Sequence, residues 1–342
     1  TVRFHLLKAG RESMYPWIKN TLAQKISAMM LPLFATDPKY ISLSTFKNSY
    51  QINKALNTLG GKFDWIIAHN PGSFWACSEY AKKHQCKFGV DMEDYHPGET
   101  TDHAKAKLLK TYLAKTLKNA NYISAASPLI MEHTMADMAG YTGQSTVILN
   151  SFPQKEFQAP ICNKQEKISL VWFSQHINYG RGIEQIASVL NKMDDRFEVH
   201  LYGKMHEDFF NKHLKDIKNL FCHGVVSQQE LHIELCLFDV GLALEDINAD
   251  LNRQLCITNK LLAYSQAGIF ILASDTPAQQ QFLQQHSSCG ITTTLQPADI
   301  EEKLNYIYEH IAEIRSNKVN CFETAKHLAW ENESLKLRAV IS

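Results

Sequence analysis

A phosphate-binding turn is the first chemistry that the second half of the sequence suggests. Thr258, Asn259 and Lys260 follow a polar loop and open a predicted helix. Thr258 suits the N-cap of that helix, whose free backbone N–H groups and dipole would attract a phosphate. Lys260 would add a point charge, although it could equally be a solvated lysine of the first helical turn. Arg181, in the glycine-bearing turn 178–182, is a second candidate because a guanidinium fork suits a diphosphate, but it could also be an ordinary surface residue.

Acids and a histidine follow two predicted strands of the first half. His69 comes directly after the apolar run WIIA, so its imidazole should lie at the rim of a sheet and could act as an acid, a base or a polar contact. The segment 91–99, DMEDYHPGE, concentrates carboxylates beside it and offers Asp94 and Glu93 as general bases. Hard metal ligation and a plain solvated acidic loop are the alternatives. Gly10, after the first predicted strand, belongs to the same rim.

Short β-rich runs alternate with helical patterns along the chain, which is typical of parallel strands joined by crossover helices. Ligands of such open sheets bind outside the carboxyl ends of the strands, where the candidate residues lie. The sequence therefore predicts two α/β halves. In the first half we expect strands at 2–7, 64–69, 87–91, 121–125 and 146–150 and a weaker one at 30–34; in the second half we expect them at 169–173, 197–203, 220–224, 240–245, 269–274 and 290–294.

The domain boundary is predicted between these halves. The chain of 342 residues is roughly twice a typical domain in length, and the stretch 151–167 has two prolines, mixed charge and no periodicity. We expect a first domain at 1–152, a linker at 153–167 and a second domain at 168–331. The last helix, at about 332–342, should cross back over the first domain.

Composition excludes several classes of protein. Lysine and arginine number 35, as do aspartate and glutamate, so the chain lacks the net positive charge of a dedicated nucleic-acid binder. There is no phosphate-loop motif GxxxxGK[ST], and no GxGxxG after the first strand, which removes the main support for a nucleotide triphosphatase or an ordinary dehydrogenase.

No signal peptide or spanning apolar run is seen, so we expect a cytoplasmic protein. The eight cysteines are scattered without a CxxC pair and are expected to be reduced thiols.

The segment 102–119 is a predicted amphipathic helix with a basic face. At about 100° per residue, its lysines fall on one side and its apolar residues on the other. The ordinary interpretation is a helix packed on the sheet with a solvated lysine face. The alternative is a docking face for anionic lipid head groups, which would place the protein peripherally on the inner face of the membrane. The lysines are Lys107, Lys110, Lys115 and Lys118, and the opposite face has Leu109, Tyr112, Leu113 and Thr116.

The second half resembles nucleotide-sugar-dependent glycosyltransferases of the B-type architecture, in particular those of family 4, also called group 1. Four stretches carry the resemblance: the turn with Arg181 and Gly182, the HGVV turn at 223–226, the strand DVGLAL at 239–244, and NKLLAYSQAGIFILAS at 259–274. In the first half, DWIIAHNP is similar to the family's apolar strand that ends in a histidine before a proline.

The resemblance implies two Rossmann-like parallel-sheet domains facing across a cleft. The second would hold a nucleoside-diphosphate sugar and the first an acceptor. Arg181 would contact the diphosphate, the backbone of Val225 and Val226 would lie at the base, and residues 258–260 would lie near the phosphates. His69 matches the histidine that contacts the donor sugar in the family.

One departure from the family concerns the donor. Many members have two glutamates eight positions apart, and this chain has Leu255 and Ala263 in those places. Glu245 or Asp246, which lie nearby, could provide the missing contacts to the donor.

We therefore expect a glycosyltransferase with a role in cell-surface glycan synthesis (capsule, lipopolysaccharide or exopolysaccharide), with no metal and no tightly bound cofactor. If transfer inverts the configuration at the anomeric carbon, Asp94 or Glu93 is the expected base that deprotonates the acceptor. If transfer retains the configuration, His69 would orient the donor. A sugar-nucleotide epimerase of the same architecture, or a catalytically silent sugar-nucleotide-binding protein, are the alternatives.

Overall fold

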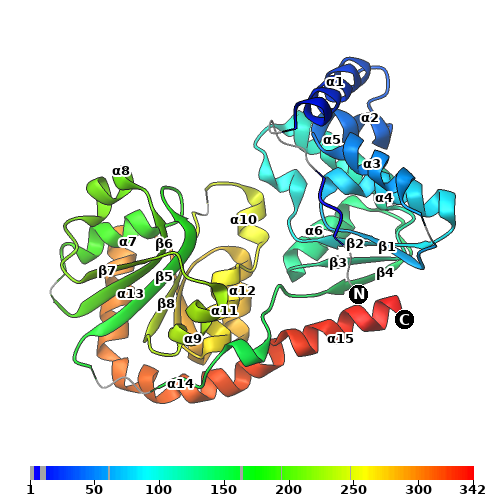
Figure 1. Cartoon of the computed structure of the whole chain (residues 1–342). Helices are drawn as coiled ribbons and strands as arrows, with labels where there is room; N and C mark the ends of the chain where they lie inside the picture. The colour runs from blue at the N-terminus through cyan, green and yellow to red at the C-terminus, as the bar shows by residue number, and fades with distance from the viewer. Residues whose placement is uncertain (1–3, 8–12, 61, 162–164, 194, 247) are drawn as a thin grey trace. The chain divides into compact units, whose positions relative to one another are not determined.

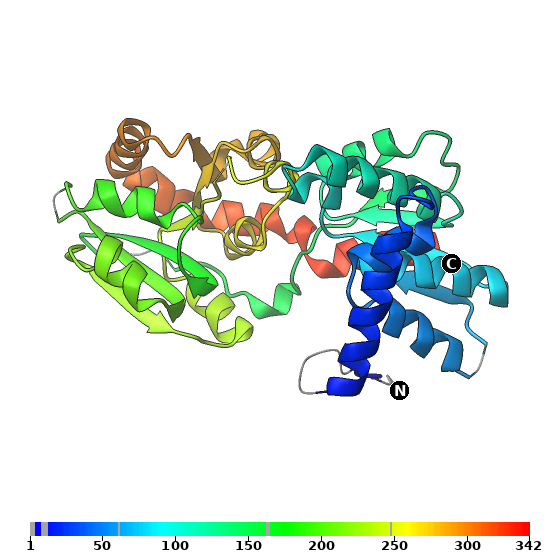
Figure 2. The same ribbon diagram turned by 90° about the horizontal axis from the view of Figure 1, so that it is seen from above.

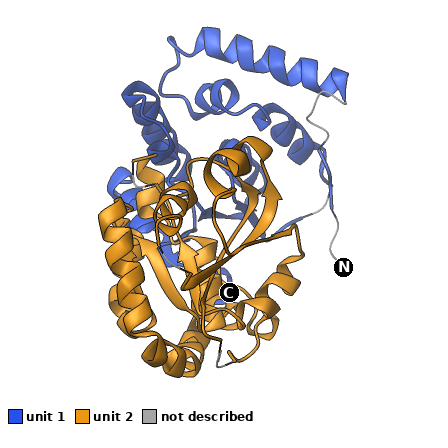
Figure 3. Cartoon of the chain, turned by 90° about the vertical axis from the view of Figure 1, so that its left-hand side faces the viewer, with its two compact units in different colours: residues 1–148, 338–342 blue, residues 149–337 orange. Residues whose placement is uncertain are grey.

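The computed structural model describes residues 4–7, 13–60, 62–161, 165–193, 195–246 and 248–342. The chain forms two compact units, residues 1–148 with 338–342 and residues 149–337 (Figure 3). The expected linker at 153–167 thus lies inside the second unit. The C-terminal residues that belong to the first unit are held by Trp65, whose Nε1 donates to the carbonyl oxygen of Ile341 at 3.1 Å.

The first unit contains a four-stranded parallel sheet in the order β1-β2-β3-β4 (Figure 1). Helices connect the strands, as the alternating pattern predicts, and the polar N-cap residues Asn70, Asp102 and Ser127 begin three of them. The elements are β1 (Trp65–Ala68), α4 (Pro71–His84), β2 (Lys87–Met92), η1 (His96–Glu99), α5 (His103–Leu117), β3 (Tyr122–Ala125), α6 (Pro128–Asp137) and β4 (Gln144–Val147).

The N-terminal part of this unit differs from the prediction. Residues 4–7 are exposed and irregular instead of forming a strand, and residues 1–3 lie outside the described chain. The weaker strand expected at 30–34 is wrong as well, because α1 (Met14–Met30) runs into a turn there. A short apolar run does not distinguish a strand from the end of a helix, and Pro32 cannot donate to a strand ladder. Two more helices follow, α2 (Pro38–Thr45) and α3 (Ser49–Thr58).

The second unit contains a six-stranded parallel sheet in the order β10-β9-β8-β5-β6-β7 (Figure 1). Side chains pack on both of its faces, which explains the near-continuous apolar strands of the sequence. The strands are β5 (Ile168–Ile177), β6 (Phe197–Met205), β7 (Leu220–Gly224), β8 (Val240–Ala243), β9 (Phe270–Ser274) and β10 (Gly290–Thr293).

The prediction of an α/β fold with two parallel sheets is therefore confirmed. No helix in the described parts of the chain is long and apolar enough to cross a membrane.

The principal helices of the second unit are α7 (Ile183–Leu190), α9 (Gln228–Leu235), α10 (Leu251–Leu255), α11 (Asn259–Ala267), α12 (Pro277–Gln285), α13 (Pro297–Glu309), α14 (Ile311–Ala325) and α15 (Trp330–Ile341). The last residues of α15 belong to the first unit. A short helix α8 (Glu207–Phe209) leads into a π-helical turn η3 (Phe210–Leu214), and 3-10 turns lie at η2 (Gln154–Glu156), η4 (Ser287–Cys289) and η5 (Lys326–Leu328).

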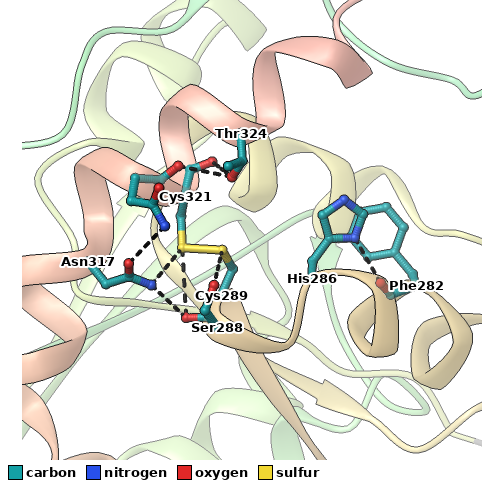
Figure 4. Close-up of a disulfide and its surroundings, with 8 residues drawn as sticks. Phe282, His286, Ser288, Cys289, Asn317, Cys321 and Thr324 are labelled. Carbon is teal, nitrogen blue, oxygen red and sulfur yellow. Dashed lines mark hydrogen bonds between the residues drawn. A yellow bond between two sulfur atoms is a disulfide. The ribbon is translucent and has the colours of Figure 1, made fainter.

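The expectation that all eight cysteines are reduced is wrong for two of them. Cys289, at the end of η4, and Cys321, in α14, form a disulfide with a Cα–Cα distance of 5.8 Å (Figure 4). Asn317 braces it by donating to the carbonyl oxygen of Ser288 at 2.9 Å. The two cysteines are 32 positions apart, so only the tertiary fold brings them together. Cys162 lies outside the described residues.

Reducing this disulfide is expected to lower the free energy of unfolding of the second unit by about 3–4 kcal/mol, because the bond restricts the unfolded chain across the segment it closes. The measurement is denaturant unfolding with and without dithiothreitol. The variant Cys321→Ser should be insensitive to the reductant. Equal unfolding midpoints of the parent protein in both conditions would show that the bond does not stabilise the fold.

Candidate active site

His69 and Asp91 form a pair at the carboxyl ends of β1 and β2. The strands are parallel with Ala68 beside Val90, so the next residues on each strand are neighbours. His69 Nδ1 lies 3.0 Å from Asp91 Oδ2. A carboxylate only accepts, so the Nδ1 proton points to Asp91 and Nε2 remains as the reactive nitrogen of the neutral ring. This is the arrangement of a general base that is oriented by a carboxylate.

β3 completes this cluster by fixing the carboxylate. The hydroxyl groups of Ser124 and Tyr122 both donate to Asp91 Oδ1. Both oxygens of Asp91 therefore accept hydrogen bonds, and His69 is the more exposed member of the pair, with 61% of its side chain exposed. Asp91 belongs to the predicted acidic segment, where it was one of several carboxylates expected to supply a base and was not expected to orient His69. The signal that identifies it is strand register, since it sits one position beyond the residue paired with Ala68.

The two carboxylates predicted as acceptor bases lie just beyond β2. Glu93 is exposed and Asp94 is half-buried in the bend between β2 and η1. The charge of Glu93 contributes to raising the pKa of His69, after the larger contributions of the hydrogen bond and the charge of Asp91. Gly10, predicted at the same rim, lies outside the described residues.

The pKa of His69 is raised above its ordinary value of 6.5, mainly by the hydrogen bond to Asp91. A raised pKa means that folding favours the protonated ring, so its contribution to stability is present below about pH 6.5 and is lost as the pH rises through the raised pKa. We expect Asp91→Asn to lower the pKa of His69 in an NMR titration of the ring protons. An unchanged pKa in that variant would refute the pairing.

In the second unit, Glu245 and Lys260 form a buried ion pair. Lys260 Nζ lies 2.9 Å from Glu245 Oε1, and both side chains are less than one-tenth exposed. Thr258 caps α11, as predicted, by accepting from the backbone N–H of Leu261 at 3.3 Å. The alternative of a solvated lysine is wrong, because Lys260 points inward and its Nζ also lies 5.8 Å from the ring centroid of Trp172.

Arg253, on α10, is a functional candidate that the sequence analysis missed. Its guanidinium donates to the carbonyl oxygen of Gly180 at 2.8 Å and lies 3.7 Å from Glu245 Oε2. Asp250, which caps the same helix, lies 3.6 Å from its Nε. Arg253 thus links the carboxylate of Glu245 to the turn that contains Arg181. Only the contact itself reveals this link, because nothing in the spacing of the sequence relates Arg253 to that turn.

The turn 178–182 is shaped to present a helix N-terminus. Gly182 has a φ of +78°, and a Cβ there would lie 2.6 Å from that of Leu244, so the position needs glycine. Gly182 is also the N-cap of α7 and has no side chain to satisfy the first N–H groups of that helix. Glu184 steadies the turn by accepting from the N–H of Gly180 at 2.7 Å. Arg181, next to the N-cap, is exposed and available to an anion.

The remaining predicted donor residues lie on other strand ends of this sheet. Val225 is exposed and Val226 is half-buried just after β7, while Asp246 is half-buried after β8 and Asn259 is exposed in α11. Leu255 and Ala263, which replace the glutamate pair, are buried. No set of three or more His, Cys, Asp and Glu side chains in the described residues is placed to hold a metal ion.

No model of a protein family matches the sequence, and neither does the sequence of any curated protein. Solved structures do match. Anabaena HepE in complex with UDP is similar over 86% of this chain and 81% of its own, with a TM-score of 0.67 and 12% identity. A glycosyltransferase from Rickettsia africae covers 87% of this chain and 80% of its own, with a TM-score of 0.65 and 11% identity.

Sucrose-phosphate synthase from Thermosynechococcus elongatus also has this fold, with a TM-score of 0.64 and 13% identity over 88% of this chain and 78% of its own. Such low identities establish the fold and leave the chemistry to the residues. The chain has the fold of the B-type, group 1-like glycosyltransferases.

Proposed function

We propose that the protein is a glycosyltransferase that moves a sugar from a nucleoside-diphosphate sugar to a hydroxyl acceptor. The observation that carries the proposal is that three basic side chains, two of them paired with acids, lie with two helix N-termini at one edge of the second sheet. Exposed Arg181, the Lys260–Glu245 pair and Arg253 lie where α7 and α11 begin, at the carboxyl ends of the strands. Helix N-termini and cations at this edge favour a diphosphate.

The donor is proposed to bind with its diphosphate at this edge. HepE has been solved with UDP and with UDP-glucose, which supports a uridine or related nucleotide as the donor. The backbone of Val225 and Val226 is proposed to contact the base. Thr258 and Asn259 would help to present the N–H groups of α11, and Glu245 or Asp246 would accept hydrogen bonds from hydroxyl groups of the donor in place of the missing glutamate pair.

Transfer would break the bond between the anomeric carbon and the diphosphate oxygen, which leaves with the electron pair. Arg181, Lys260 and the N-terminus of α11 would stabilise the charge that grows on the leaving group, so a metal ion is not required. The acceptor oxygen bonds to the anomeric carbon and gives up its proton. Asp94 or Glu93 is the proposed base that takes this proton in an inverting reaction. In a retaining reaction the oxygen of the departing diphosphate would take it, and His69 would orient the donor sugar.

The proposed role is the synthesis of a cell-surface glycan such as capsule, lipopolysaccharide or exopolysaccharide, from the cytoplasmic side. The acceptor would be a glycan or a lipid-linked glycan, with no nucleic acid as a partner. No tightly bound cofactor is proposed. The solved relatives include a lipopolysaccharide outer core galactosyltransferase that covers 86% of this chain, with a TM-score of 0.59, which supports this class of acceptor.

A catalytically silent sugar-nucleotide-binding protein is the second candidate. The observation that favours it is the burial of Leu255 and Ala263, which puts apolar side chains where many group 1 enzymes have two acids. Such a protein would bind the donor without releasing the nucleotide.

The proposal is tested by incubating the protein with a panel of nucleotide sugars and measuring the release of nucleoside diphosphate. Release that depends on an added glycan acceptor supports sugar transfer. Release without an acceptor would support hydrolysis or an epimerase, and binding without release would support the silent protein. The variant Arg181→Ala tests the proposed diphosphate contact. It removes an exposed charge, so it should lower the release of nucleoside diphosphate without affecting folding.

A further inference from the structure

Helix α1 has an apolar face that points away from the protein. Its outward residues Tyr15, Ile18, Leu22, Ile26 and Met29 are between 49 and 80% exposed. Their spacing of three or four positions places them on one stripe about 80° wide. Leu33 and Phe34, in the turn that follows, extend the apolar surface and are also exposed.

The inward face of α1 is polar, which is the reverse of an ordinary surface helix. Asn20 and Ser27 are 1% and 5% exposed, and the side-chain amide of Gln24 donates to the carbonyl oxygen of Ser44 at 3.0 Å. Within the first unit, α1 lies on the side away from the sheet and packs against α2 and α3 (Figures 1 and 3). The apolar stripe is therefore not buried in the core of the first unit. A continuous row of exposed apolar side chains favours an apolar partner outside the unit.

Positive charge surrounds the stripe. Residues 13–63 contain six lysines and a single acid, Asp37. Lys19 and Lys25 border the stripe on opposite sides by the 100° rotation per residue. Lys19 Nζ lies 4.1 Å from the centroid of the Tyr15 ring, so this cation is held beside the outer face.

This charge distribution decides between two occupants of the stripe. A second copy of α1 would bring lysines against lysines with no acid on either helix to pair them, which is unfavourable at helix interfaces. An anionic lipid surface would accept both the apolar side chains and the flanking lysines. The length of α1, the blue helix near the N-terminus, can be followed in Figure 2.

We propose that α1, with the turn at Leu33 and Phe34, is a membrane-docking helix that lies in the plane of an anionic bilayer surface. The apolar stripe would enter the boundary between head groups and acyl chains, and the lysines would contact lipid phosphates. This proposal does not depend on the proposed sugar transfer, because it uses none of the residues of the candidate active site.

The basic helix α5 does not combine lysines with exposed apolar side chains as α1 does. Lys107, Lys110 and Lys115 of α5 and Lys118, its C-cap residue, are exposed, as predicted, and Lys110 pairs with Asp137 at 2.9 Å. However, Leu109, Tyr112 and Leu113, on the opposite face, are buried in the first unit. α5 can therefore offer charge to a membrane but no apolar side chains, so it serves as the internal comparison for α1.

The test is cosedimentation with vesicles of phosphatidylcholine alone and of phosphatidylcholine mixed with phosphatidylglycerol. We expect the parent protein to sediment with the mixed vesicles and much less with the neutral ones. The variant Ile18→Ser/Leu22→Ser/Ile26→Ser should lose binding by at least about tenfold, because three apolar side chains no longer enter the bilayer surface. Since these side chains are exposed, its thermal unfolding should match that of the parent.

A matched control changes exposed apolar residues of the second unit, Leu237→Ser/Val319→Ser/Leu335→Ser, and should bind as the parent does. Three results would overturn the proposal: no binding of the parent to mixed vesicles, equal binding of the α1 variant, or loss of binding only when the four α5 lysines are replaced. A dimer of the parent in analytical ultracentrifugation that the α1 variant abolishes would instead assign the stripe to a second copy.

Discussion

Replacing Lys260 by alanine is expected to weaken nucleoside diphosphate binding by about 10- to 150-fold, the effect of losing one charge-assisted contact worth about 1.5–3 kcal/mol. Lys260 Nζ has three N–H donors, and the ion pair with Glu245 uses one of them. Another of these donors is proposed to bind a phosphate at the start of α11. Calorimetric titration with a nucleoside diphosphate measures the change, and an unchanged affinity would remove Lys260 from the donor site.

The same substitution should also lower the free energy of unfolding by about 3 kcal/mol, because Glu245 would remain as a buried charge with only the more distant Arg253. The double variant Glu245→Gln/Lys260→Met separates the two effects. It removes both charges at similar volume, so its stability should be close to that of the parent while its affinity for nucleoside diphosphate stays low. Recovery of that affinity in the double variant would mean that the loss in Lys260→Ala came from disturbed folding.

Replacing His69 by alanine is expected to lower kcat by about 10²-fold, because the donor sugar would no longer be held in its reacting position. The affinity for nucleoside diphosphate should not change, because the diphosphate contacts are proposed on the second unit. Steady-state kinetics with a nucleotide sugar and a glycan acceptor provide the measurement.

Asp91→Asn is the matched variant, because it keeps the volume beside His69 but removes the charge that holds the Nδ1 proton. It should give a smaller fall in kcat than His69→Ala and a pH profile shifted towards acid, in keeping with a lower pKa of His69. A His69→Ala enzyme with normal kcat would show that the pair is structural.

Much of the fold follows from local sequence patterns. The strands β5 to β10 and their helices were predictable because apolar runs and capping residues such as Thr258 are local signals. The N-terminal region was not, since α1 has its polar residues inside and its apolar residues outside. A periodic pattern gives a helix but does not say which face is buried, and here the short apolar run at its end was mistaken for a strand.

The candidate site was predictable as a set of strand ends but not as a set of contacts. His69, Glu245 and Lys260 were identified because they follow strands or begin a helix. The His69–Asp91 pair required the register of β1 and β2, and the Glu245–Lys260 pair required the packing of α11 beside β8. Arg253 and the Cys289–Cys321 disulfide depend on tertiary contacts between segments far apart in sequence, for which a single sequence has no local signal.

The second unit is proposed to hold a nucleoside diphosphate at the carboxyl edge of its sheet. A crystal structure of the protein with UDP would show where the diphosphate binds. The diphosphate is expected within hydrogen-bonding distance, about 3 Å, of Arg181 or Lys260 and at the N-terminus of α7 or α11. UDP bound away from this edge, with both cations making only the contacts described above, would contradict it.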